Sequence, residues 1–141
     1  MNTLESAAAP FVHERIAVVD LQPTGTGATS DGITEVGIVL VDHGVVVDEW
    51  STLVNPGYSI PPEIQALTGI SDAMVRDAPA FEDIAGDVLA RLEGRLFVAH
   101  NARFDYGFLK NAFRRAGISF TADVLCTVRL SRRLYPQHAQ H

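Results

Sequence analysis

Residues 15–25, RIAVVDLQPTG, form the first of three apolar runs, and ITEVGIVLVD (33–42) and VVVDEWSTLV (45–54) are the second and third. All three runs are rich in Val and Ile, which favour strands. The short junction between the second and third runs contains Gly44, as expected for the tight turn of an antiparallel hairpin. The chain is therefore predicted to open with three strands and no helix between them.

Helices and strands alternate in the rest of the predicted structure. Pro62 is placed to open a short helix that Gly69 ends. Apolar residues recur at helical spacing over 81–94 and over 101–117, with Gly94 and Gly117 as C-terminal signals and Asn101 as an N-cap. A buried strand at 95–99, an ambiguous short strand within 118–126 and a helix at 127–135 complete the pattern. This order predicts an α/β fold with helices packed on a mixed sheet.

The composition is that of one domain with its own core. The chain has 141 residues, of which 47% are hydrophobic. Residues 1–14 are small, polar and without periodicity, so we expect a flexible lead before a single domain at 15–141. Cys126 has no partner for an internal disulfide, the N-terminus lacks the features of a secretory signal, and no apolar run is long enough to cross a bilayer. These features predict a cytoplasmic protein without membrane association.

The charge is unevenly distributed along the chain. The net charge is −6, yet residues 101–141 carry most of the basic residues and only two acidic ones. This asymmetry is compatible with a local basic surface that binds nucleic acid. On charge alone, solvated helix faces explain it equally well. The basic residues concerned are Arg103, Lys110, Arg114, Arg115, Arg129, Arg132 and Arg133.

Asp20 lies where the first apolar run ends, a position at which α/β proteins place ligands. Alternate residues of a strand face the same side, so Asp20 and Gln22 are expected to point together, and Pro23 favours extended backbone at Gln22. The alternative is an aspartate that only begins the turn. The following glycines, GTGATS (25–30), are treated as loop formers, because a strand and not a helix comes after them.

Asp105 is the second candidate for a chemical role. It lies in the first turns of the helix that follows the strand at 95–99 and the pair His100-Asn101. The positive end of the helix dipole favours an ionised carboxylate there, and free backbone N–H groups can hold a phosphate. The alternative is an aspartate that only stabilises the dipole, with His100 capping a strand.

Three motifs together resemble the DEDD exonuclease superfamily, in particular the DnaQ-like proofreading group represented by the epsilon subunit of bacterial DNA polymerase III. DLQPTG (20–25) is similar to D-x-E-T-T-G, and HNARFDYGFL (100–109) matches H-N-A-x-F-D-x-x-F-L at every fixed position. The stretch between them, NPGYSIPPEIQALTGISDAMV (55–75), resembles the family segment that contains L-T-G-I. The likeness spans residues 15–136 and implies an RNase H-like fold with an antiparallel opening followed by parallel strands.

The resemblance also implies a function, the hydrolysis of phosphodiester bonds at nucleic-acid 3′ ends, as in DNA replication. Two ions of Mg²⁺ or Mn²⁺ would activate water and stabilise the leaving oxygen. Asp20, Gln22 and Asp105 are the implied catalytic metal ligands. The implied partners are single-stranded DNA or RNA 3′ ends and a DNA polymerase subunit. The implied substrate-binding residues are Thr24, Gly25, Leu67, His100, Asn101 and Phe104.

Two departures from the family pattern predict low activity. Gln22 stands where the family has Glu, so one negative charge is missing, and Pro23 replaces the first Thr. The third motif, H-x-x-x-x-D, is absent, because no Asp follows His138 or His141 at that spacing. The domain is therefore expected to be C-terminally incomplete, and Gln22→Glu alone is not expected to restore cleavage. The alternative is a non-catalytic nucleic-acid-binding or scaffold module.

Overall fold

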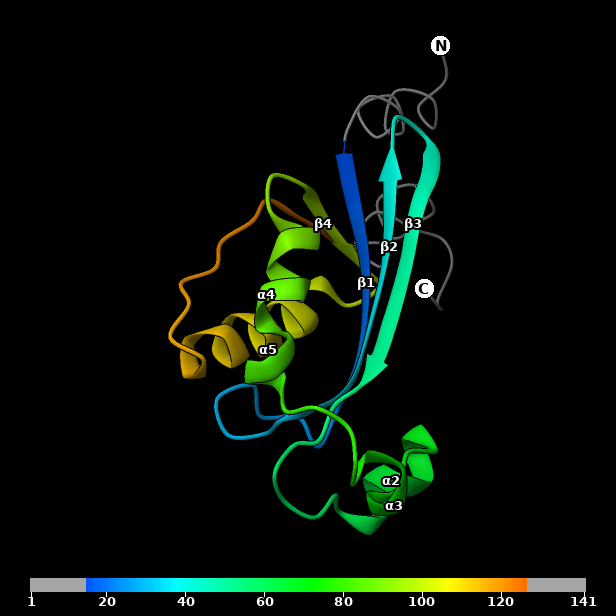
Figure 1. Ribbon diagram of the computed structural model, residues 1–141, viewed down its shortest axis with the longest axis vertical. Coiled ribbons are helices and arrows are strands. Elements are labelled where there is room, and N and C mark those ends of the chain that lie inside the picture. Colours follow the sequence, from blue (N-terminus) through cyan, green and yellow to red (C-terminus); the bar gives the residue numbers. More distant parts are fainter. Residues whose placement is uncertain (1–14, 127–141) are drawn as a thin grey trace, which may run out of the picture.

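The computed structural model of the protein describes residues 15–126. These residues form one five-stranded sheet with helices (Figure 1). The strands occur in the sheet in the order β3-β2-β1-β4-β5. In chain order the elements are β1 (Arg15–Pro23), β2 (Ile33–Asp42), β3 (Val45–Leu53), α2 (Pro62–Thr68), α3 (Asp72–Val75), α4 (Phe81–Leu92), β4 (Leu96–Ala99), α5 (Ala102–Arg115) and β5 (Val124–Cys126).

The sheet is mixed, as the sequence predicted. β1 pairs antiparallel with β2, and β2 pairs antiparallel with β3. β4 is parallel to β1, and β5 is parallel to β4. The turn between β2 and β3 has positive φ angles at His43 (51°) and Gly44 (81°), which suit the twist of a two-residue hairpin. The predicted antiparallel opening, and the strand expected within 118–126, are both confirmed.

Helices α4 and α5 both cover one face of the sheet (Figure 1). Ala17, Val19 and Leu21 of β1 point toward these helices and are buried in the main core. The core continues through an aromatic group in which the ring centroids of Phe81 and Phe113 lie 5.2 Å apart and those of Phe113 and Phe120 lie 5.0 Å apart. Burial of this apolar surface fixes the direction in which each side chain of β1 points.

The opposite face of β1 carries the alternate residues. Val18 is 39% exposed and Asp20 is also exposed, because their side chains point away from α4 and α5. A hollow on this open face is lined by Val18, Asp20, Gly37, Ile38, Val39, Glu49, Trp50 and Ser51. The first acidic candidate residue therefore lies on the face of the sheet that α4 and α5 leave uncovered.

Helices α2 and α3 lie beyond one end of the sheet (Figure 1). They enclose a small second core of Ile60, Ile70 and Val75. Pro62 begins α2 and Gly69, with φ 78°, ends it as predicted. The sequence prediction omitted α3, which is only four residues long. Ser71 caps the start of α3, because its hydroxyl accepts a hydrogen bond from the backbone N–H of Met74 (3.3 Å).

Two further outcomes concern the helix ends and the C-terminal segment. α4 ends at Leu92 and α5 at Arg115, slightly before Gly94 and Gly117, which both have positive φ. The predicted helix at 127–135, together with His138 and His141, lies outside the described residues. Within residues 15–126, no helix has the length and apolar character needed to cross a membrane.

The core predicts the effect of a large-to-small substitution. Phe113 is fully buried between Phe81 and Phe120, so Phe113→Ala leaves a cavity and should lower the free energy of unfolding by about 3–5 kcal/mol. Val46 is 55% exposed on β3, so Val46→Thr should change that free energy by less than about 0.5 kcal/mol. Denaturant titration measures both values, and equal losses would contradict this assignment of the core.

Candidate active site

Asp20 and the first turn of α5 approach each other because β1 is longer than β4. The parallel pairing between these strands runs only from Ile16–Leu96 to Val18–Val98, while β1 continues to Pro23. Asp20 therefore lies beyond the paired part of β4. The chain leaves β4 at Ala99 and begins α5 at Ala102, so the start of α5 lies next to the unpaired side of β1.

Asp105 is a buried carboxyl group in the first turn of α5. Its exposed fraction is 7%. Burial, and to a lesser extent the charge of Asp20, raise its pKa from 3.8 to about 7. Because Asp20 acts on Asp105 in this way, the two carboxylates lie close together in space although they are far apart in sequence.

The helix dipole favours the charged form of Asp105, as the sequence predicted, but burial and the like charge of Asp20 raise its pKa in the opposite direction. No described residue donates a hydrogen bond to the Asp105 carboxylate, so nothing in this part of the chain compensates its charge. A group that neutralises this negative charge would therefore be stabilised between the two aspartates.

Gln22 lies on the same face of β1 as Asp20. Its backbone carbonyl accepts a hydrogen bond from the Thr34 hydroxyl (3.0 Å), and its direct neighbour on β2 is Glu35. Glu35 is thus a further carboxylate near this edge of the sheet. Sequence reasoning missed it, because only the pairing register of β1 with β2 places Glu35 opposite Gln22.

The loop after β1 holds Thr24 and Gly25. Thr24 is 1% exposed, and its hydroxyl lies 2.5 Å from the Tyr58 hydroxyl and accepts a hydrogen bond from the Gly32 N–H (2.9 Å). A Cβ atom at Gly25 would lie 2.5 Å from a carboxylate oxygen of Asp31, so a side chain there would require the Asp31 side chain to move. The Thr24 hydroxyl therefore supports the loop, as does the Thr24 N–H, which donates to the Gly32 carbonyl (2.9 Å).

The remaining predicted substrate residues occupy different positions around this region. Leu67 on α2 is 81% exposed, and His100 and Asn101 are exposed between β4 and α5. Asn101 occupies the predicted N-cap position, but its side chain makes no capping hydrogen bond, which corrects that detail. Phe104 is half-buried, with its ring centroid 4.7 Å from that of Phe108.

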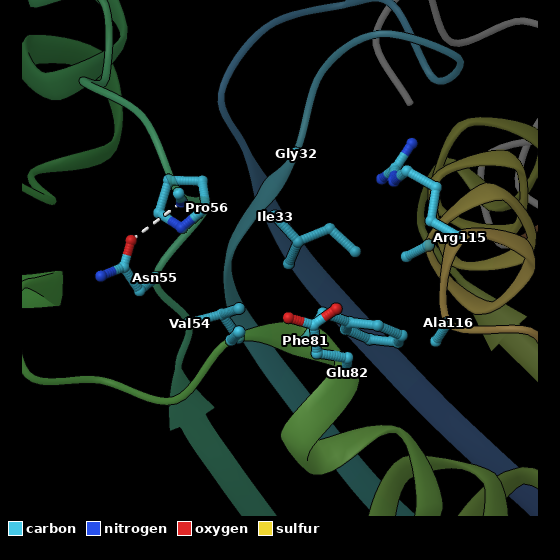
Figure 2. A pocket seen from close by; sticks show the side chains of 12 residues that line it. Gly32, Ile33, Val54, Asn55, Pro56, Phe81, Glu82, Arg115 and Ala116 are labelled. Atoms are coloured by element: carbon cyan, nitrogen blue, oxygen red, sulfur yellow. Dashed lines mark hydrogen bonds between the residues drawn. The ribbon is translucent and has the colours of Figure 1, made fainter.

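A separate cavity of about 220 Å³ lies between the helices and the loops (Figure 2). Gly32 and Ile33 from the start of β2, the segment 54–57, the start of α4 and the end of α5 form its walls. Figure 2 shows Pro56 and Asn55 on one side and Arg115 on the other. Asp20 and Asp105 do not line this cavity, so it is distinct from the carboxylate pair.

The donor set suits a divalent cation in part. Hard cations such as Mg²⁺ prefer carboxylate oxygens, and the buried, uncompensated Asp105 beside Asp20 offers such oxygens. Within residues 15–126, however, no group of three or more His, Cys, Asp or Glu side chains is arranged to hold a metal ion. The described residues therefore fit one cation between two aspartates better than a complete two-ion centre.

The family of the chain follows from a match between residues 17–141 and a family model described as exonuclease. The chain therefore belongs to this exonuclease family, within the DEDD superfamily of DnaQ-like 3′–5′ exonucleases, and by family it is a nuclease of the hydrolase class. The family resemblance inferred from the two aspartate motifs is confirmed.

Curated relatives carry the same domain in longer chains. A Mycobacterium tuberculosis protein named as a candidate bifunctional exonuclease/endonuclease is 47% identical over 124 residues, which are 83% of this chain and 19% of the relative. The 3′-5′ exonuclease DinG of Bacillus subtilis is 39% identical over 87% of this chain and 13% of its own length. A PolC-type DNA polymerase III of Caldanaerobacter subterraneus is 40% identical over 84% and 8%. The chain thus spans less than a fifth of each relative.

Solved structures agree with the fold. Exonuclease X, in complex with 5′ overhanging duplex DNA, has a TM-score of 0.71 and 31% identity over 89% of this chain and 68% of its own. Exonuclease I without ligand has a TM-score of 0.79 over 87% of this chain and 31% of its own, and at 17% identity it supports the fold alone. The expected RNase H-like fold is confirmed.

The raised pKa of Asp105 predicts a pH dependence of stability. A carboxyl group whose pKa rises from 3.8 to about 7 on folding favours the folded state fully below pH 3.8, and this contribution is lost progressively as the pH rises from 3.8 to about 7. Between about pH 5 and about pH 8, the free energy of unfolding of Asp105→Asn should therefore gain about 1–3 kcal/mol relative to that of the wild type. Thermal melts in the presence of a chelator measure this difference.

The matched control for this experiment is Asp77→Asn. Asp77 is exposed, and no hydrogen bond to its side chain is seen within residues 15–126. This variant should keep the pH dependence of the wild type. The free energy of unfolding of Asp105→Asn could instead change with pH by the same amount as that of the wild type, from about pH 5 to about pH 8. In that case the fold does not hold the Asp105 carboxyl group in the protonated form.

Proposed function

We propose that this domain acts on the 3′ ends of nucleic acids, with weak metal-dependent exonuclease activity. The observation that supports this proposal most is the pairing of Asp20 with the buried Asp105, because the DEDD pattern requires these two residues together. Membership of the exonuclease family supports the reaction type. Exonuclease X, a neighbour in fold and sequence, was solved with DNA.

In this proposal the two aspartates and the Gln22 amide oxygen hold the divalent cation. When bound, the cation supplies an activated water and stabilises the charge that develops on the phosphate. The burial of Asp105 favours cation binding, because a bound cation would offset the free-energy cost of an ionised carboxylate that is shielded from water. Gln22 contributes an oxygen without a charge, so the site attracts a cation less strongly than one with Glu at that position.

The terminal nucleotide would lie between the loop after β1 and helix α2. Gly25 is partly exposed in the loop, and Leu67 extends its exposed side chain from α2. His100, Asn101 and Phe104 lie where β4 turns into α5. An apolar Leu67 is suited to contact a base, whereas the polar groups are suited to the phosphate and sugar. The substrate is single-stranded DNA or RNA, and a DNA polymerase is a possible partner by analogy with the PolC-type relative.

The activity can be tested with a 3′-labelled single strand and Mn²⁺. We expect slow release of mononucleotides that falls to background in Asp20→Asn and in Asp105→Asn, because each change removes one of the two carboxylates. A circular strand should stay intact and serves as the control for internal cleavage. Gln22→Glu should tighten cation binding, measured by calorimetry, without restoring rapid cleavage, because the described residues do not supply the rest of the family's metal centre. Rapid release by the wild type would contradict the expected impairment, and release unaffected by either aspartate substitution would contradict the site.

A second candidate function is a nucleic-acid-binding module without catalysis. Exposed Arg103, Arg114 and Arg115 on α5 favour it, as does the lack of a complete metal-binding group within residues 15–126. In this case the cations on α5 would hold phosphates, and binding would not require a metal. The two functions differ in whether Asp20 and Asp105 affect binding.

Salt dependence separates the two candidates. For binding through phosphates, the logarithm of the affinity for a single strand should fall linearly with the logarithm of the salt concentration. Arg103→Gln should reduce that slope by about 0.7, whereas Arg15→Gln, at the opposite end of β1 from Asp20, should leave it unchanged. Fluorescence anisotropy with and without Mg²⁺ measures the slopes. A slope that is the same with and without metal supports the binding module, and binding that needs the metal supports a residual active site.

A further inference from the structure

The loop after β1 (residues 24–32) is closed by its own hydrogen bonds. The Thr24 N–H donates to the Gly32 carbonyl (2.9 Å), and the Gly32 N–H donates to the Thr24 hydroxyl (2.9 Å). Within the loop, an Asp31 carboxylate oxygen accepts from the Gly27 N–H (2.8 Å). A Cβ atom at Gly107 of α5 would lie 3.6 Å from the Cβ of Ala28, so the loop also packs against α5. The loop is therefore a defined unit between β1 and α5.

Tyr58 connects this loop to a different part of the chain. Its hydroxyl lies 2.5 Å from the Thr24 hydroxyl and accepts a hydrogen bond from the Gly32 N–H (2.8 Å). The side chain of Tyr58 is 46% exposed, so packing in a core does not account for its position. Gly32 permits the close approach, because a Cβ atom there would lie 3.3 Å from both the Tyr58 hydroxyl and the Cβ of Pro56. Figure 2 shows Gly32 passing beside the segment that contains Pro56.

The segment that carries Tyr58 leads directly into α2 and α3. The next two residues are bound to Asp72 of α3, whose carboxylate accepts from the Ser59 hydroxyl (2.8 Å) and the Ile60 N–H (2.8 Å). These hydrogen bonds, with that of Ile60 the larger cause, lower the pKa of Asp72. Leu67 lies on α2 within the same small unit, which is held by its own core of Ile60, Ile70 and Val75. Tyr58 is thus the side chain through which this unit is bonded to the loop after β1.

We infer that Tyr58 is a positioning residue, which holds the loop of Thr24 and Gly25 at a fixed distance from Leu67 so that together they receive the 3′-terminal nucleotide. This inference rests on the proposed function. Its physical basis is that the two sides of the nucleotide site come from different elements, the loop after β1 and the α2–α3 unit, whose small core also contacts Leu53 at the end of β3. Without the Tyr58 hydroxyl, the loop loses its hydrogen bonds to the segment that leads into α2, so its position relative to Leu67 is less firmly held.

The test uses Tyr58→Phe, which removes only the hydroxyl, and Tyr106→Phe as a matched control. The Tyr106 ring packs against Phe97 and Phe120, and its hydroxyl makes no hydrogen bond to another residue of the described range. Two quantities are measured on the full chain. The first is the amide exchange rate of residues 24–32. The second is the preference for a linear strand with a 3′-hydroxyl, measured as the ratio of the dissociation constant for a circular strand to that for the linear strand. The last linkage of the linear strand is a phosphorothioate, which slows cleavage.

We expect Tyr58→Phe to speed amide exchange in the loop and to reduce the preference for the linear strand by about threefold to tenfold, with unchanged affinity for the circular strand. Tyr106→Phe should change neither quantity. Thr24→Val combined with Tyr58→Phe should reduce the preference at least as much as the stronger single change, because the pair removes the bond between the two hydroxyls and also both acceptors of the Gly32 N–H. Faster exchange with an unchanged preference would overturn the positioning role. A wild type without any preference for a 3′ end would instead overturn the proposed function, and the exchange data would still report whether the tether exists.

Discussion

The candidate site depends on a carboxyl group buried next to another carboxylate. Asp105 is held in the first turn of α5 by the packing of that helix on the sheet, and it remains beside Asp20 although both burial and like charge raise its pKa. Without a neutralising group nearby, this arrangement disfavours the ionised form of the Asp105 carboxyl group. The large apolar core beneath α4 and α5 supplies the stability that keeps the two acids together. A cation or a proton between them would relieve the same unfavourable interaction, so the proposed cation binding is linked to the stability of the fold.

The side chains on the two faces of β1 have different structural roles. Ala17, Val19 and Leu21 anchor the strand to the helices, while Val18 and Asp20 point to the uncovered face. Because side chains alternate in a strand, the anchoring residues fix the orientation of Asp20 and Gln22 without any contact to them. The early end of β4 then leaves room for α5 to bring in its own carboxylate. A shift of one residue in register would turn Asp20 into the core, so the core packing and the site cannot change independently.

The α2–α3 unit gives the site a second wall that the sheet does not provide. It has its own small core and its own hydrogen-bonded aspartate, and Tyr58 bonds it to the loop after β1. The two aspartates lie on β1 and α5, whereas Leu67 lies on α2. In the proposed site, the cation and the terminal nucleotide would therefore be bound by different elements. Gln22 would lower the negative charge at the proposed cation site, within a chain that belongs to the exonuclease family.

The sheet, most helix positions and the two aspartates could be predicted from the sequence, because Val- and Ile-rich runs, helical spacing and Gly or Pro signals are local properties of the chain. The H-N-A-x-F-D pattern also identified the family. The raised pKa of Asp105, the position of Glu35 opposite Gln22 and the hydrogen bond between Tyr58 and Thr24 depend on tertiary packing. The tertiary structure also showed α3, which is too short to give a periodic pattern, and an Asn101 side chain that does not cap its helix. Burial, strand register and contacts between distant segments arise when the whole chain packs, so no local stretch of sequence encodes them.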